Sequence, residues 1–253
     1  MKKILILSLI TVISLFAPSH YLMAKDISPY AQLLKSYISQ GTKDGIKTSL
    51  VDYDQWSTDP LHEQAMDLLT KTNPDSLSQA EKMAFWINSY NLLTIDLIIK
   101  NNEKESIKNL GSFIQSPWKS HSWNLNGKNY TLHNIEHQVL RPMGDPRIHV
   151  AINCASLSCP DLLHEPYEAS RLNQQLNQQV RLFLQNRTKG VLMDGSGVQI
   201  SAIFQWFSQD FNKKNAPKSK IGVITFINNH SKSSLSPSEH LEYLKYNWKL
   251  NAK

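Results

Sequence analysis

Apolar residues recur every three or four positions along several stretches of the chain, which is typical of amphipathic helices. The spacing predicts helices over residues 28–40, 59–71, 78–99, 132–140 and 170–186, and a short aromatic helix over residues 201–211. The third of these has the strongest start signal, because Ser78 and Glu81 stand at capping-box spacing directly before its apolar run. Asp59, Thr131 and Ser201 are suited to cap three of the other helices.

Two shorter segments have the pattern of a β-hairpin. Residues 123–131 contain Asn126-Gly127, and residues 190–200 contain Asp194-Gly195, and both dipeptides favour a tight turn between antiparallel strands. Strands are thus few and short beside the helices. The expected fold class is α+β, with helices packed around a small, mostly antiparallel sheet.

Residues 147–153 alternate between apolar and polar positions, which predicts one further strand. Its apolar face would consist of Ile148, Val150 and Ile152. On a regular strand, His149 and the following Cys154 would point to opposite faces. The two side chains can therefore meet only if the chain turns at Cys154.

Three polar side chains fall on helix faces that are otherwise apolar. Asn88 and Asn91 lie on the expected core face of the helix over residues 78–99, and Glu136 lies within the apolar stripe of the helix over residues 132–140. A buried carboxylate is costly unless it is paired, so we expect Arg141 or Arg147 to neutralise Glu136. The two arginines and the two asparagines are also the candidates for substrate binding.

The N-terminus has the pattern of a secretory signal peptide. A short basic start is followed by an apolar run and by Ala24, after which we expect cleavage, so residues 1–24 form the predicted signal peptide. We expect a periplasmic or secreted protein with no stable membrane span after cleavage, because no later run of about 18 apolar residues occurs. An uncleaved anchor is the alternative.

The remaining residues 25–253 are expected to form one globular domain with a helical N-terminal layer over residues 25–77 and a core over residues 78–251. The chain carries a formal charge of +6, and removal of Lys2 and Lys3 with the leader leaves +4. So diffuse an excess does not indicate nucleic acid as a partner. Glycine-rich phosphate loops are absent from the sequence, and no cofactor is expected.

The only two cysteines lie in the segment IHVAINCASLSCP, at positions 154 and 159. In an oxidising compartment Cys154 and Cys159 could form a disulfide, and closing so short a loop contributes roughly 2 kcal/mol. Alternatively, one of them is a nucleophile with a neighbouring imidazole. Pro160 suits the first position of a helix, which would make Cys159 its N-cap.

The stretch His133-Asn134-Ile135-Glu136-His137 matches the inverted zinc-protease motif H-x-x-E-H. On a helix, two histidines at this spacing lie one turn apart and can bind zinc while the glutamate handles the water. A zinc site formed by His133 and His137 is therefore a second interpretation, although the sequence assigns no third ligand.

Five motifs occur in order along the chain: AFWINSYNLLTIDLI, LHNIEHQVLR, DPRIHVAINCASLSCP, ISAIFQWFSQDF and YLKYNWKLN. In these motifs the chain resembles the domain-of-unknown-function family 547 (DUF547), from about Ser78 to Asn251. The resemblance implies a shared fold and shared residues, and no known reaction. The positions that match the family pattern are Glu136, His137, Arg141, Asp145, Arg147, His149, Asn153, Cys154, Ser158, Cys159 and Pro160.

Two positions depart from the family pattern. Ala155 stands where glycine is usual, which predicts that the turn after Cys154 does not need a positive φ. Asn247 stands where an aspartate is usual and removes a carboxylate. The family pattern accepts cysteine or serine at position 159, so we expect Cys154 to be the nucleophile and Cys159 to assist it.

These observations favour an exported, thiol-dependent hydrolase or acyl transferase with a small-molecule or peptide-like amide substrate. Its expected groups are the nucleophile Cys154, a base at His149 or His137, an orienting group at Glu136 or Asn153, and substrate contacts from Arg147, Arg141, Asn88 and Asn91. One alternative is a non-catalytic binding or scaffold module of the cell envelope with a Cys154–Cys159 disulfide. The other is a zinc-dependent hydrolase that uses His133, Glu136 and His137.

Overall fold

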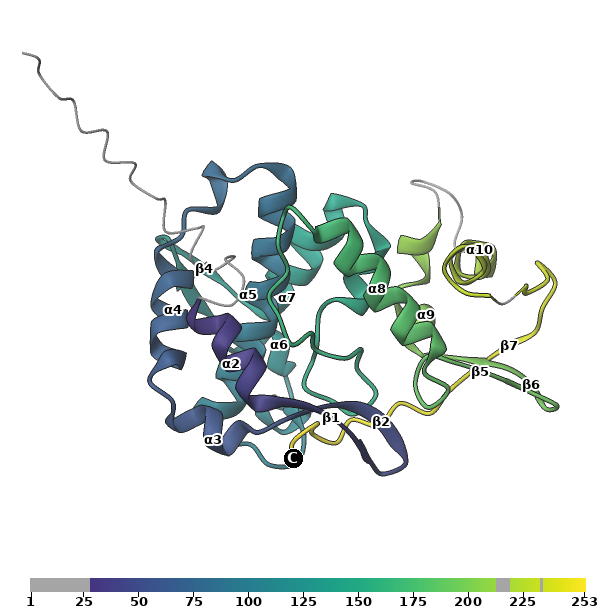
Figure 1. Ribbon diagram of the computed structural model, residues 1–253, viewed down its shortest axis with the longest axis horizontal. Helices are drawn as coiled ribbons and strands as arrows, with labels where there is room; N and C mark the ends of the chain where they lie inside the picture. The colour runs from purple at the N-terminus through teal and green to yellow at the C-terminus, as the bar shows by residue number, and fades with distance from the viewer. Residues whose placement is uncertain (1–27, 213–218, 233) are drawn as a thin grey trace, which may run out of the picture.

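The computed structural model describes residues 28–212, 219–232 and 234–253. The predicted signal peptide over residues 1–24 lies outside the described residues. The described part has an α+β fold, as predicted, in which helices surround small sheets. Figure 1 shows the N-terminal helices gathered at one end of the molecule and the C-terminal helices and strands at the other.

The N-terminal part contains more than the helices that the sequence pattern predicts. Ser28 caps the first helix by accepting a hydrogen bond from the Ala31 N–H at 3.0 Å. Asp44 and Gly45 both have positive φ and form the tight turn of an antiparallel hairpin. The elements in order are α2 (Pro29–Tyr37), β1 (Ile38–Lys43), β2 (Ile46–Val51), α3 (Tyr53–Thr58) and α4 (Leu61–Lys71). The prediction that helix continues to residue 40 was wrong, because the hairpin begins at Ile38.

A long buried helix, α5 (Gln79–Lys100), forms the centre of the molecule. The structure confirms its capping box: the Ser78 side chain accepts from the Glu81 N–H while the Glu81 side chain accepts from the Ser78 N–H. A short 3₁₀ turn, η1 (Pro74–Ser76), precedes α5. After α5 the chain forms η2 (Ile107–Leu110), α6 (Pro117–Ser120) and the predicted hairpin of β3 (Trp123–Leu125) and β4 (Lys128–Tyr130).

The segment after this hairpin differs from a regular helix followed by a strand. Thr131 caps α7 (Leu132–Asn134) as predicted, and the chain then widens into a π-helical turn, η3 (Ile135–Leu140), before two 3₁₀ turns, η4 (Arg141–Met143) and η5 (Pro146–Val150). The predicted strand over residues 147–153 was wrong. Asp145 caps η5 by accepting from the Arg147 N–H, and residues 148–153 are all buried, so the alternation in sequence does not correspond to one buried and one exposed face.

The C-terminal part begins with the predicted amphipathic helix, α8 (Leu172–Gln185), and the predicted hairpin, β5 (Val191–Asp194) and β6 (Gly197–Ile200). It continues through α9 (Ile203–Trp206), η6 (Ser208–Phe211), α10 (Lys220–His230) and β7 (Leu241–Tyr243). Strand β7 pairs with β6 in parallel, while the other strand pairs are antiparallel. The end of the chain then returns to the N-terminal half, where Ala252 pairs with Val51.

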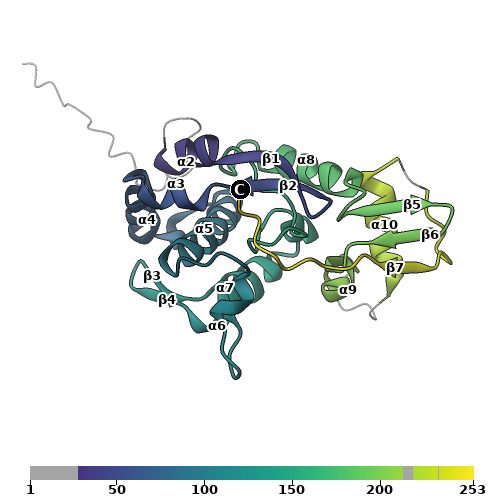
Figure 2. The same ribbon diagram turned by 90° about the horizontal axis from the view of Figure 1, so that it is seen from below.

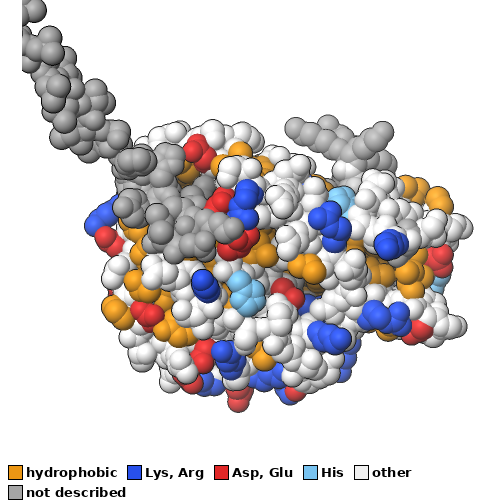
Figure 3. Space-filling model, in the orientation of Figure 1, with side chains coloured by type: hydrophobic (Ala, Val, Ile, Leu, Met, Phe, Trp, Pro, Cys, Tyr) orange, Lys and Arg blue, Asp and Glu red, His pale blue; other side chains and the backbone are white. Residues whose placement is uncertain are grey.

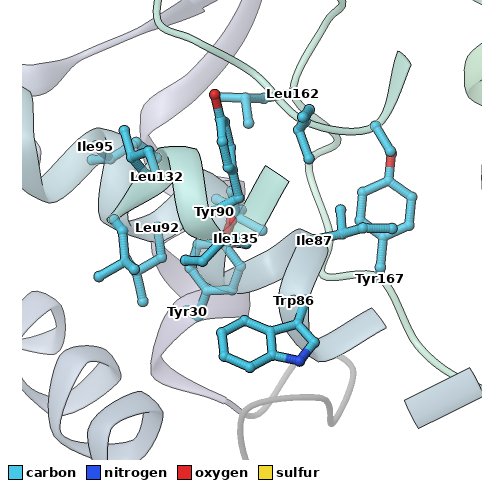
Figure 4. Packing of buried hydrophobic residues seen from close by; sticks show 14 of the residues in the cluster. Tyr30, Trp86, Ile87, Tyr90, Leu92, Ile95, Leu132, Ile135, Leu162 and Tyr167 are labelled. Carbon is cyan, nitrogen blue, oxygen red and sulfur yellow. The ribbon is translucent and has the colours of Figure 1, made fainter. Parts of the chain in front are cut away.

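Buried apolar residues form two clusters. The larger one surrounds α5, and Figure 4 shows how Tyr90 of this helix packs among Leu132, Ile135 and their neighbours. The smaller one joins α8, α9, α10 and the three-stranded sheet, and includes Val180, Phe204 and Ile224. Extended burial of this kind is what stabilises a chain of this size. The assignment of residues 25–253 to a single domain stays a prediction.

Within the described residues, no helix is both long and apolar enough to cross a membrane. On the face of the molecule shown in Figure 3, basic and acidic side chains are interspersed with apolar ones.

Candidate functional site

A pocket of about 240 Å³ lies at the junction of the two clusters. Tyr90 and Ile152 reach it from the larger cluster, and Ile203 reaches it from the smaller one. The remaining lining residues are Ser116, Trp118, His133, Glu136, His137, His149, Cys154, Cys159, Pro160, Trp206, Phe207, Tyr246 and Trp248. A concave, largely apolar site with a few converging polar groups is typical of small-molecule binding.

Both cysteines line this pocket as free thiols, so no disulfide joins them in the structure. The backbone N–H of Cys154 donates a hydrogen bond to Cys159 Sγ over 2.9 Å. The Cys154 sulfur lies 3.3 Å from Ser156 Oγ and 3.4 Å from the Tyr246 hydroxyl, and Ser156 donates to the same hydroxyl over 3.0 Å. The two sulfurs thus belong to one hydrogen-bonded cluster.

Within this cluster the pKa values of the two thiols shift in opposite directions. Burial raises the pKa of Cys159, but hydrogen bonds from the Cys154 thiol, the Tyr246 hydroxyl and the Cys154 N–H outweigh it and lower that pKa to about 6. The hydrogen bond to Cys159, together with burial, raises the pKa of the Cys154 thiol well above its ordinary value. Near neutral pH the pair therefore holds one proton and one negative charge, with the charge on Cys159.

The turn that brings the two sulfurs together is built by Asn153 and Ala155. Ala155 has a φ of 60°, so the prediction that this turn avoids a positive φ was wrong. The Asn153 side chain stabilises the turn by accepting from the Ala155 N–H over 2.7 Å and donating to the Pro160 carbonyl over 2.7 Å. Asn153 therefore shapes the loop and does not orient a histidine. The predicted helix at Pro160 is also absent, so Cys159 is not an N-cap.

His149 reaches the pocket from η5 and is held by a carboxylate from another part of the chain. Its Nε2 lies 2.8 Å from Asp210 Oδ2, and its ring stacks on Phe207 with 4.1 Å between ring centroids. Burial lowers the pKa of His149, against the opposing effect of Asp210, so the ring is neutral at neutral pH. The orienting group expected at Glu136 or Asn153 is thus supplied by Asp210.

Arg141 completes this arrangement. It donates to Asp210 Oδ2 from Nε over 2.6 Å and to Oδ1 from Nη2 over 2.8 Å, and its Nη1 lies 2.8 Å from Nδ1 of His137. Burial by itself raises the pKa of Asp210, but the hydrogen bonds from His149 and Arg141 hold it well below the ordinary range. Burial, with the nearby His133 and Arg141, lowers the pKa of His137 to about 4. Arg141 therefore fixes His137 of the pocket wall and Asp210, the partner of His149, and has little capacity left for a substrate.

Glu136 lies in the pocket without the ion pair that the sequence suggests. Its closest recorded contact is the Tyr90 hydroxyl, 3.4 Å from Oε2, and Trp118 Nε1 donates to the same hydroxyl over 3.1 Å. Burial raises the pKa of Glu136 to about 7, and the nearby Arg141 offsets this only in part. Glu136 comes from the π-helical turn η3, an irregularity often found at functional sites.

The other predicted substrate contacts lie elsewhere. Arg147 pairs with Asp145, with 2.6 Å between Nη2 and Oδ2, and donates to two asparagines of α8, so it neither neutralises Glu136 nor lines the pocket. Asn88 and Asn91 use their amides on backbone groups: Asn88 donates to the Tyr167 carbonyl over 2.8 Å and Asn91 to the Ala151 carbonyl over 3.0 Å. Asn91 thus ties the segment before Cys154 to α5, and Asn88 ties the segment at Tyr167 to the same helix.

The structure places the rings of His133 and His137 side by side, as a zinc site would require, but the set of ligands is incomplete. The centroids of His133 and His137 lie 4.4 Å apart in the pocket wall. In the described parts of the chain, no three histidine, cysteine or acidic side chains converge in a way that could hold a metal ion. Because protein zinc sites use three or four such ligands, His133 and His137 do not fit one.

Sequence reasoning missed three residues of the site. Asp210 and Tyr246 fall within the motifs ISAIFQWFSQDF and YLKYNWKLN, so their position in these motifs was the available signal. Lys189 is buried and donates to the Cys159 carbonyl over 2.6 Å, to Thr48 Oγ1 over 2.6 Å and to Asp161 Oδ1 over 2.5 Å. Only the folded chain brings it to the cysteine loop. The family departure at Asn247 lies outside the pocket lining.

Aromatic side chains form one rim of the pocket. Trp206 stacks on Trp248 with 5.6 Å between centroids and an interplanar angle of 19°, and Tyr246 lies within 4.8 Å of the Trp206 ring. Trp206 is 46% exposed, which leaves its ring accessible to a ligand at the mouth. Such a surface can hold an apolar or planar group beside the thiols.

One comparison with known proteins gives a match, and it covers part of this site. Residues 74–184 match the family model described as "Protein of unknown function, DUF547". No curated protein and no solved structure matches the chain. The matched range contains α5, Glu136, His149 and both cysteines, while Asp210 and Tyr246 lie beyond it. Over residues 74–184, the chain is therefore similar to the DUF547 family.

Proposed function

We propose that this protein is a thiol-dependent hydrolase or acyl transferase that acts on a peptide-like or amide substrate. The observation that carries the proposal is the hydrogen bond of 2.9 Å from the Cys154 N–H to Cys159 Sγ within the pocket. Because the Cys159 pKa is lowered to about 6, a thiolate is available at neutral pH, and the thiolate is the reactive form of cysteine.

Cys154 is the sulfur that attacks, because it is partly exposed whereas Cys159 is only 3% exposed. As Cys154 Sγ forms its bond to the substrate carbonyl carbon, its proton passes along the existing hydrogen bond to the Cys159 thiolate. The leaving amine takes this proton from Cys159 when its bond to the carbonyl carbon breaks. The acyl group then remains on Cys154 as a thioester.

His149 is the base for the second half of the reaction. Its ring is neutral and is fixed by Asp210 and Phe207, so it can accept a proton from water or from an acceptor amine. The new bond to the carbonyl carbon displaces Cys154, and His149 returns the proton to the Cys154 sulfur. This restores the starting state of the pair.

We further propose that the mature chain is exported, on the basis of the basic and apolar N-terminal residues. The intact mass of the protein recovered from outside the cytoplasm tests this. Cleavage after Ala24 gives a chain that begins at Lys25, whereas a mass that retains residues 1–24 contradicts the prediction.

The thiol mechanism is tested by iodoacetamide alkylation of the native protein across pH, with the modified sulfur mapped by mass spectrometry. In the wild type we expect the alkylation rate of Cys154 to rise with a midpoint near pH 6, the pKa of the Cys159 thiol, because the Cys159 thiolate accepts the proton of Cys154. In Cys159→Ser we expect the midpoint of Cys154 alkylation to move up to about 8.5 or higher, because the proton acceptor is gone and Cys154 must ionise by itself.

The same proteins are then given p-nitrophenyl acetate. We expect an initial burst of p-nitrophenol and an acetyl group on Cys154 in the wild type, and neither in Cys154→Ser. The double variant that lacks both cysteines supplies the reagent blank. A native protein without free thiols, or a wild type that reacts only with an ordinary thiol pKa, would contradict the proposal and favour the disulfide-containing binding module.

A further inference from the structure

The loop over residues 111–116, between η2 and α6, exposes two large apolar side chains. Phe113 is 109% exposed and Ile114 is 96% exposed, and both values exceed those of the other large hydrophobic residues found exposed in the described parts of the chain. Figure 2 shows the chain next to α6 extending as a narrow loop beyond the rest of the ribbon. Water-exposed apolar residues adjacent in sequence at such a tip are typical of an interaction site.

This loop is held in shape by its own hydrogen bonds. Ser112 N–H donates to the Gln115 carbonyl over 2.8 Å, and Ser112 Oγ accepts from the Gln115 N–H over 3.0 Å. At its base, a Cβ on Gly111 would approach Pro117 Cδ to 2.8 Å, so the two ends of the loop lie close together. The loop therefore presents Phe113 and Ile114 in a fixed position.

The loop adjoins the mouth of the pocket. Ser116 and Trp118, directly after it, line the pocket. Lys119 lies close enough to His133 to lower the pKa of that histidine, alongside the larger effect of burial, and Lys108 Nζ lies 5.3 Å from the Trp248 ring centroid. Two lysines therefore flank both the apolar tip and the pocket mouth.

We propose that this loop inserts into the surface of an anionic lipid bilayer. Residues 103–128 contain four lysines and two glutamates, and Lys104 is paired with Asp54, so Lys108 and Lys119 are the lysines that flank the tip. Apolar side chains that enter the acyl region, with lysines at headgroup level, are the usual composition of such a contact. Two side chains at a narrow tip offer far less area than the roughly 800 Å² per partner of a stable protein interface, which favours a membrane over a protein.

This contact would turn the pocket mouth toward the bilayer. If the proposed function holds, the substrate class would then be an amphiphilic amide or ester whose apolar part is anchored in the membrane; this step rests on the proposed function. The docking itself does not, because vesicle binding needs no turnover.

The test is cosedimentation of the purified protein with vesicles of phosphatidylcholine and phosphatidylglycerol, compared with phosphatidylcholine alone. We expect the wild type to bind the anionic vesicles and the variant Phe113→Ser/Ile114→Ser to lose about tenfold or more of its affinity. Ile221→Ser is the matched control, because Ile221 is 54% exposed on α10 and does not line the pocket, and its binding should not change. All proteins share the same N-terminus, which is checked by mass.

Either of two results would overturn the proposal: a wild type that does not bind anionic vesicles, or a double variant that binds them as well as the wild type does. The burst with p-nitrophenyl acetate is measured in parallel, because this soluble probe does not need the bilayer. An intact burst with no vesicle binding would refute membrane docking alone, while vesicle binding without a burst would refute the proposed function alone.

Discussion

In the described residues, two buried histidines each pair with an aspartate, and the two pairs differ in their surroundings. His62 Nε2 lies 3.0 Å from Asp96 Oδ1, and His149 Nε2 lies 2.8 Å from Asp210 Oδ2. Both histidines are nearly inaccessible, at 4% and 3% exposed. The distance and the burial of the histidine therefore do not distinguish the two pairs, whereas the aspartates differ: the side chain of Asp96 is 0% exposed and that of Asp210 is 20% exposed.

The first pair, His62 and Asp96, is hydrogen-bonded to other residues of the protein. Trp56 Nε1 donates to His62 Nδ1 over 3.0 Å, so both ring nitrogens are used. Asp96 accepts in addition from Trp123 Nε1 over 2.6 Å and pairs with Lys100. None of these residues lines the pocket, and the network joins α3, α4, α5 and β3.

The second pair faces a space where a ligand can bind. The ring of His149 lines the pocket beside both cysteines, and Asp210 is shared with Arg141. The difference teaches that a histidine–aspartate pair becomes a candidate for catalysis through an accessible cavity and a nucleophile nearby. Changes at Asp96 and Asp210 test this comparison directly, and a change at Glu136 tests the pocket beside the second pair.

Of the three substitutions, Asp96→Asn should have the largest effect, which is a loss of folding stability. The change leaves His62 and Trp123 facing a poorer acceptor and removes the charge that pairs with Lys100, which for a buried pair costs about 3–5 kcal/mol. Urea unfolding monitored by circular dichroism measures the loss. The burst with p-nitrophenyl acetate per folded molecule should stay unchanged. A variant with normal stability and a lost burst would break the comparison, because it would give the first pair a role in the reaction.

Glu136→Gln should change how stability depends on pH. The folded-state pKa of Glu136 is about 7 against an ordinary value of 4.5, so the folded protein binds more protons than the unfolded chain between these values. Stability therefore falls as pH rises from about 4.5 to about 7, by about 3 kcal/mol from this group.

The glutamine variant should lack this decline, so that its stability relative to the wild type increases by that amount between pH 4.5 and pH 8. Urea unfolding at both pH values measures it. Asp96 and Asp210 have lowered pKa values, and their contributions have the opposite sign: they are present above the ordinary aspartate pKa and are lost as pH falls. Parallel pH curves for wild type and variant would show that Glu136 is not held protonated.

Asp210→Asn should affect turnover more than stability. The amide no longer pairs with Arg141 and holds His149 less firmly, so we expect the release of the acetyl group from Cys154 to slow about a hundredfold. Steady-state hydrolysis after the burst measures this rate. Asp96→Asn is the matched control, because the same chemical change is made at the other pair. Equal rates in the two variants would remove the proposed role of the His149–Asp210 pair.

The sequence predicted the local elements where short-range signals are strong. The capping box of α5, the Asn126-Gly127 turn and the cap at Thr131 are all present, because neighbouring residues supply both partners of each hydrogen bond. The strand predicted over residues 147–153 was wrong, because an alternating pattern cannot show that both faces of a segment are buried. The Asp44-Gly45 dipeptide of the first hairpin is a local turn signal of the same kind.

For the candidate site, the sequence identified the cysteines, His137, His149 and Glu136, all of which line one pocket. It assigned Arg147, Asn88 and Asn91 to substrate binding, whereas their partners are carboxylate, amide and backbone groups of the chain. Residue type and motif membership indicate which side chains carry chemistry. They do not indicate which of those side chains already form hydrogen bonds or ion pairs within the protein.

By itself the sequence determined the α+β class, the similarity of residues 74–184 to the DUF547 family and the segment that carries both thiols, since each depends on residues close together in the chain. Only the tertiary structure decided that Asp210 holds His149, that Tyr246 contacts the thiols and that Lys189 binds the Cys159 carbonyl. These contacts join residues 30 to 92 positions apart. Such pairings are set by the packing of the two apolar clusters against each other, which no local pattern of residues records.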